Sequence, residues 1–126
     1  AVRYLDIFGD GSYRLTRSIE SPGAIAAFSA NPARFTPNGD GRADTTRIAW
    51  RLANRGRVRL TIRDRNGAAV RRVNFGSEPV GAESFRWSGR GDGGRARPAG
   101  RYTAVLSWAD GEGRVASRRT EITLRR

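Results

Sequence analysis

Apolar and polar residues alternate along much of the chain, most regularly in its middle part. Residues 47–52 place an apolar side chain at every second position, and residues 57–63 repeat the pattern. A period of two is expected for a strand with one buried face. The sequence therefore predicts two strands with an apolar inner face and an arginine-rich outer face. The short Asn54–Gly56 turn between them predicts an antiparallel hairpin.

Other short apolar runs follow, each bounded by glycine, proline, asparagine or aspartate. The runs lie at residues 24–29, 70–75, 83–87, 102–108 and 122–124. With the two strands above they make about seven strands at a spacing typical of two-sheet folds. The predicted fold class is therefore all-β, an immunoglobulin/fibronectin III-like β-sandwich.

The N-terminal residues form a separate pattern. Apolar runs at residues 2–7 and 12–19 flank the turn-rich segment 8–11, which predicts an extra β-hairpin. Residues 20–23 then read as a linker. We therefore divide the chain into residues 1–23, a hairpin or the end of a preceding domain with its linker, and residues 24–126, the β-sandwich domain.

Arginine dominates the charge of the chain. All 24 basic residues are arginine, 12 acids oppose them, and the formal net charge is +12. A set of outward-facing arginines on the two predicted middle strands would form a positive stripe: Arg47, Arg51, Arg57, Arg59 and Arg63. Such a stripe would bind anionic polysaccharides, teichoic-acid-like cell-wall polymers or nonspecific nucleic acid. The alternative is a solvated face that keeps sheet edges from aggregating.

Several functions are disfavoured by composition. The chain has no Cys, His or Met, so it lacks disulfides, thiol nucleophiles, imidazole bases and the usual transition-metal ligands. Its few acids lie mostly in turns, and we expect no catalytic activity. No pattern of a recognition helix, zinc finger or aromatic RNA-binding sheet predicts sequence-specific nucleic-acid binding. No apolar run approaches the roughly 18 residues that a membrane span needs, so we expect no membrane insertion.

Three motifs in order along the chain resemble one known family. Phe35–Asp44 resembles an F-S-P-N-G-D-G-x-x-D opening, and Gly56–Asp64 resembles a G-x-V-x-L-x-V-x-D strand. Trp87–Tyr102 then resembles a W-x-G, D-x-x-G, P-x-G-x-Y signature. This order is that of the Ig-like domain first described in the flagellar hook-assembly (hook-capping) protein, and the resemblance covers roughly residues 24–124.

The resemblance implies an Ig-like sandwich of the kind found at the C-terminal ends of secreted and cell-surface bacterial proteins. We therefore expect a non-catalytic spacer or assembly module, whose first partner is the rest of its parent polypeptide. An extracellular or cell-surface location is implied as well. The alternative is an adhesive module that binds anionic polymers through its arginines.

Calcium is the one cofactor that the sequence suggests. Asn38, Asp40 and Asp44 fall at positions 3, 5 and 9 of an EF-hand-type loop. Thr36 and Arg47 occupy the places of the first aspartate and the bidentate acid, so further oxygens would have to come from elsewhere in the fold. The alternative is that these side chains cap turns by accepting backbone N–H groups.

Overall fold

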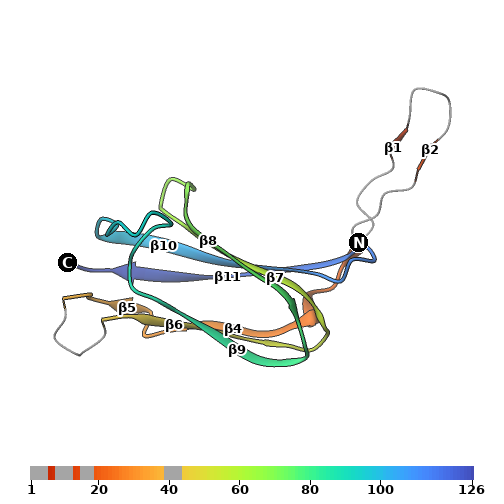
Figure 1. Cartoon of the computed structure of the whole chain (residues 1–126), viewed down its shortest axis with the longest axis horizontal. Coiled ribbons are helices and arrows are strands. Elements are labelled where there is room, and N and C mark those ends of the chain that lie inside the picture. The colour runs from red at the N-terminus through yellow and green to blue at the C-terminus, as the bar shows by residue number, and fades with distance from the viewer. Residues whose placement is uncertain (1–5, 8–12, 15–18, 39–43) are drawn as a thin grey trace.

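A computed structural model describes residues 6–7, 13–14, 19–38 and 44–126, with side chains from Glu20 onward. Residues 19–38 and 44–126 form two β-sheets packed face to face (Figure 1). The larger sheet has the order β3-β11-β10-β7-β8, and β5 also pairs with β11. The smaller sheet has the order β4-β6-β9. This two-layer, nearly all-β arrangement confirms the predicted sandwich.

The elements have the following bounds. The larger sheet contains β3 (Ile19–Glu20), β5 (Arg34–Phe35), β7 (Gly56–Arg63), β8 (Ala69–Glu78), β10 (Gly100–Ala109) and β11 (Arg114–Leu124). The smaller sheet contains β4 (Ile25–Asn31), β6 (Thr46–Leu52) and β9 (Gly81–Trp87). A 3-10 turn, η1 (Pro22–Ala24), precedes β4, and β1 (Asp6–Ile7) pairs with β2 (Tyr13–Arg14).

The hydrophobic core lies between the two sheets and is filled by the alternating inward residues of both. The burial pattern of β7 and β10 follows the period of two seen in the sequence. Large aromatic side chains occupy the centre, and the largest fully buried ones are Trp87, Trp108 and Phe35. Because each strand contributes its apolar face, the outer faces are left to the arginines.

The predicted hairpin between residues 47–52 and 57–63 is wrong. β6 belongs to the smaller sheet and β7 to the larger one, so the chain crosses the sandwich between them. Ala53 donates to Ala24 O, and the indole of Trp108 donates to Asn54 O at 3.1 Å, which fixes the connection on both sides. The inward residues of the two strands therefore face each other across the core instead of sharing one sheet.

The N-terminal residues include the predicted hairpin in short form. β1 pairs antiparallel with β2 as a separate two-stranded sheet. β3 then pairs parallel with β11, and Ser21 N donates to Val115 O at 2.8 Å. The segment that reads as a linker is thus hydrogen-bonded to the sandwich at residues 19–21. The division into residues 1–23 and 24–126 stays a prediction.

Candidate functional site

The aromatic residues of the third motif lie together in the core. Trp87 packs edge-on against Tyr102 with ring centroids 5.2 Å apart, and against Phe35 at 5.5 Å. Trp87 Nε1 donates to Arg90 O at 2.8 Å, and the Tyr102 hydroxyl donates to Pro98 O at 2.6 Å. These bonds tie the glycine-rich loop 88–99 onto the core. The motif residues therefore have a structural role.

Three carboxylates of the described chain stabilise turns and loops. Asp64 accepts backbone N–H groups from residues 66 and 68, and Asp110 accepts them from residues 112 and 114, at 2.7–3.0 Å. Asp92 accepts Arg72 N at 2.9 Å and pairs with the Arg71 guanidinium at 3.1 Å. The Arg72 N–H and the Arg71 side chain together lower the pKa of Asp92. These side chains are used as Asx caps and loop anchors.

The five arginines of the predicted stripe do not share one face. Arg47 and Arg51 are exposed on β6, in the smaller sheet. Arg57, Arg59 and Arg63 are exposed on β7, in the larger sheet. Since the outer faces of a sandwich point in opposite directions, a single stripe through all five is wrong. Binding of anionic polymers by these arginines stays a prediction.

The calcium hypothesis falls partly outside the described residues. Asp40 belongs to residues 39–43, which are not described. Asn38 is exposed and its N–H donates to Thr36 O at 2.9 Å, and Asp44 is half-buried just before β6. Within the described ranges, no three acidic, histidine or cysteine side chains gather into a metal-binding group. The set Asn38, Asp40 and Asp44 therefore stays a prediction.

Two hollows on the described surface are candidate sites. One, of about 730 Å³, lies over the larger sheet between β11, β10, β7 and β8, and Ser107, Ala109 and Ser117 are among the small residues that line it. The other, of about 260 Å³, lies between β8, the end of β9 and the glycine-rich loop. Arg71, Arg86 and Arg90 line this second hollow together with Phe85 and Asp92.

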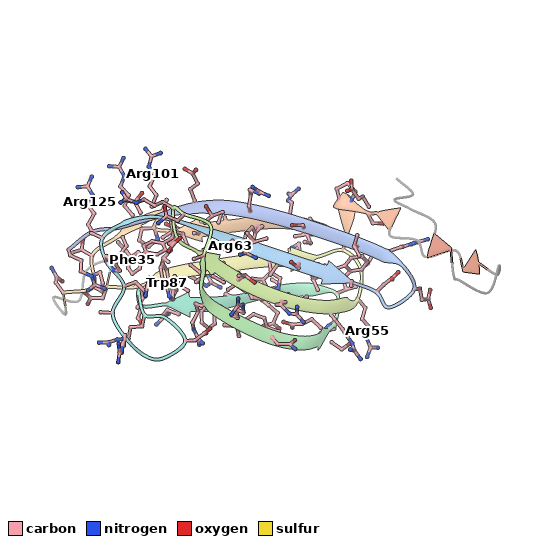
Figure 2. The ribbon with its side chains drawn as sticks, turned by 90° about the horizontal axis from the view of Figure 1, so that it is seen from above. Phe35, Arg55, Arg63, Trp87, Arg101 and Arg125 are labelled. Carbon is pink, nitrogen blue, oxygen red and sulfur yellow. The ribbon has the colours of Figure 1, made fainter. Side chains whose placement is uncertain are left out.

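A concentration of arginines that we did not predict lies at one end of the sandwich. Seven residues form this basic end: Arg34, Arg90, Arg95, Arg97, Arg101, Arg125 and Arg126. The pairing of β5 and β10 with β11 brings together β5, β10, the glycine-rich loop 88–99 and the residues after β11. Arg126 Nε also donates to Arg97 O at 3.0 Å. Figure 2 shows Arg101 and Arg125 at this end and Arg55 at the other. The density of arginine in residues 90–101 was the available sequence signal.

Two packed sheets joined by crossing connections, with an aromatic core tied to a glycine-rich loop, define an Ig-like β-sandwich domain. The family model of the FlgD Ig-like domain matches residues 33–112. The chain therefore belongs to the FlgD Ig-like domain family, which confirms the resemblance drawn from the three motifs.

Individual relatives agree with this assignment. The chain is 38% identical over 55 residues to the basal-body rod modification protein FlgD of Escherichia coli K12, covering 44% of this chain and 24% of that protein. The structure of FlgD from P. aeruginosa matches with a TM-score of 0.54 and 26% identity, over 64% of this chain and 61% of that one. PorZ of Porphyromonas gingivalis, described as a surface component of the type-IX secretion system, shares the fold with a TM-score of 0.52 and 18% identity, over 80% of this chain and 12% of that one. The chain thus spans about a quarter of the curated relative.

The comparisons correct the expected location. We expected an extracellular or cell-surface domain, and this is wrong, because the curated relative is a basal-body rod modification protein and not a plain extracellular protein. Among the described residues, no helix has the length and apolar character that crossing a bilayer requires.

Proposed function

We propose that this chain is a non-catalytic structural module that supports assembly of a larger bacterial protein. The family assignment supports this function, because the family is that of the FlgD Ig-like domain and its relative in E. coli is named a basal-body rod modification protein. The observation that carries the proposal is the use of the motif residues. Trp87 and Tyr102 fill the core and hold the glycine-rich loop, and Asp64 and Asp92 anchor turns.

A carboxylate with a structural role and one with a catalytic role have different surroundings in a folded protein. A catalytic carboxylate needs a cleft and a free face toward a substrate. Asp64 and Asp110 instead accept backbone N–H groups within their own turns, and Asp92 accepts the N–H of Arg72 in β8. The chemistry-bearing side chains are thus engaged in holding the chain's own shape, as a scaffold requires.

A domain exchange in the relative tests the assembly role. The Ig-like domain of E. coli FlgD is replaced by residues 19–126 of this chain, and swimming is scored in a strain that lacks the native protein. We expect the chimera to restore swimming at least in part. A second chimera carrying Trp87→Ala, which removes the centre of the core, should fail.

The outcome is read together with the folding of the chimera. A chimera that is produced, exported and protease-resistant but does not support swimming contradicts an assembly role that depends on the common fold. A chimera that works equally well with Trp87→Ala would contradict the structural role given to the aromatic core.

A further inference from the structure

The charge of the sandwich is divided between its two ends. The basic end carries the seven arginines defined above. The opposite end, where β7 begins and β10 turns into β11, carries five carboxylates and four arginines in its described part: Glu20, Glu78, Glu83, Asp110, Glu112, Arg51, Arg55, Arg57 and Arg114. Seven arginines thus gather at the basic end, whereas carboxylates outnumber arginines at the opposite end, and the remaining arginines of the described sandwich lie on the other strands and turns.

The arginines of the basic end are available for an external partner. Six of the seven are exposed, and Arg97 is half-buried. The ion pair recorded between described residues joins Arg71 to Asp92 and involves none of the seven. The positive charges of the basic end repel one another, so an anionic partner would reduce this repulsion and stabilise the folded protein.

The hollow beside this end adds a place for one anionic group. It holds about 260 Å³, below the roughly 300–1,000 Å³ of pockets for whole drug-sized ligands, so it suits a single sugar-sized unit. Two of its arginines are held in position: Arg71 by Asp92 and by the Phe85 ring 5.5 Å away, and Arg90 by a bond from Nη1 to Gly94 O at 2.8 Å. Guanidinium groups held in this way bind carboxylate and sulfate oxygens well.

We propose that the basic end and the adjoining hollow bind an anionic polysaccharide, with one acidic sugar unit in the hollow and further units along the arginines. The described surface offers no apolar centre for a folded protein partner, since Val80 is its one exposed large hydrophobic residue and lies in the β8–β9 connection. The Phe85 ring in the hollow is half-buried and has the Arg71 guanidinium over it 5.5 Å from its centroid, so it is a poor stacking surface for nucleic-acid bases. This proposal does not depend on the assembly role.

Polygalacturonate, a polysaccharide with a carboxylate on every sugar, is the probe, and neutral dextran is the baseline. The full chain is compared with Arg95→Gln/Arg101→Gln/Arg125→Gln at the basic end. The matched control is Arg55→Gln/Arg57→Gln/Arg114→Gln at the opposite end, which removes the same charge. All six side chains are exposed. Thermal melting of each protein first establishes that it is folded.

We expect the wild type to bind polygalacturonate with an affinity that falls steeply with salt. The basic-end variant should lose about tenfold or more in affinity, and its plot of log affinity against log salt should be less steep than that of the wild type, since binding through fewer contacts releases fewer counterions. The control variant should keep the wild-type slope and lose less than about threefold, because it removes only long-range attraction.

A further substitution tests the hollow. Arg90→Gln alone should weaken binding and lower the salt slope, while Arg55→Gln alone should not. Equal losses and equal slopes for the two triple variants would overturn the proposal, because net charge alone would then explain the binding. Absence of binding at low salt would do the same. Tighter binding of polyglutamate than of polygalacturonate would overturn the proposal and indicate an acidic protein as the partner of the basic end. Tighter binding of oligothymidylate would overturn it and indicate a nucleic acid.

Discussion

At the scale of single residues, Trp87 does the most to join the parts of this domain. Its ring lies between Phe35 and Tyr102, and its N–H holds the loop that carries Arg90. It is 2% exposed, so every face of the indole has a protein neighbour. A single side chain thereby links the core to the loop of the candidate anion site.

Trp87→Ala should lower the free energy of unfolding by about 3–5 kcal/mol, the range for removing a large buried aromatic ring. Tyr102→Phe keeps the ring and loses the bond to Pro98 O, and should cost about 1 kcal/mol. Urea unfolding followed by circular dichroism measures both. Comparable losses in the two variants would show that the loop bond, and not the packing, holds this region.

Asp92 makes the stability of the loop depend on pH. Its pKa is lowered from 3.8, first by the N–H of Arg72 and then by the guanidinium of Arg71. A lowered folded-state pKa adds stability above pH 3.8, and this stability is lost as the pH falls through the lower, folded-state value. Asp92→Asn should therefore reduce the urea midpoint at pH 7, and the difference from the wild type should narrow toward pH 2.

Arg71→Gln is the control for this pH dependence. It removes the ion pair and leaves the bond from Arg72 N, the larger cause of the shift, in place. Most of the pH dependence should therefore survive in this variant. An Asp92→Asn protein whose midpoint follows the wild type at a constant offset from pH 7 to pH 2 would contradict the assignment.

The two interpretations of Asn38, Asp40 and Asp44 differ in their response to calcium. The calcium interpretation predicts a rise in melting temperature on adding the ion, which Asp40→Ala/Asp44→Ala abolishes. The turn interpretation predicts no rise, and a lower melting temperature of the variant with or without calcium. Scanning calorimetry of both proteins, with magnesium as the reference ion, separates them.

At the scale of elements, alternation predicted most strands and missed how two of them are joined. A period of two shows which residues of β6 and β7 face the core. It does not show whether the two strands belong to the same sheet or to the two facing sheets. The three residues that connect them suit a tight hairpin, and the choice is made by distant partners: Ala24, which pairs with Ala53, and Trp108, which pairs with Asn54. Such partners are invisible to a local pattern.

The same limit explains why the sequence did not predict where the arginines of the candidate sites lie in the fold. The arginines of the predicted stripe are outward, as alternation requires, yet the crossing between β6 and β7 places them on opposite faces. The basic end could be foreseen only in part: arginines are dense in residues 90–101, but Arg34 and Arg125 join Arg101 only through the pairing of β5 and β10 with β11. The three motifs, in contrast, identified the family, because their order along the chain is itself the signal.

The start of β7 offers a sharp test of this crossing. A Cβ added at Gly56 would overlap the buried indole of Trp108 and lie 2.8 Å from Ala109 O. Gly56→Ala should therefore cost about 1–3 kcal/mol, as overpacking of a core does. Gly23→Ala, where no atom lies within 4 Å, should stay within about 0.5 kcal/mol of the wild type. Equal stability of the two variants would contradict the observed crossing.

At the scale of the whole molecule, the division of charge should influence stability. Repulsion among the arginines of the basic end is strongest at low ionic strength. The variant Arg95→Gln/Arg101→Gln/Arg125→Gln should therefore melt at a higher temperature than the wild type in low salt. The gain should shrink in about 0.5 M salt, where exposed charges are screened.

The opposite end provides the comparison. Arg55→Gln/Arg57→Gln/Arg114→Gln removes arginines from beside five carboxylates, so its melting temperature in low salt should be unchanged or lower. Differential scanning calorimetry at two salt concentrations measures both variants. An equal rise for both would mean that only the total charge matters and that its division between the ends does not.

The position of β11 in the larger sheet bears on how the protein is made. β11 pairs with β10 over nearly its whole length and also with β3 and β5, which come from the other end of the domain's sequence. During synthesis, β3 and β5 are therefore made before β11, the strand with which they pair. A nascent chain that still lacks β11 has no partner strand for β3 and β5, so the larger sheet stays incomplete until β11 has been made.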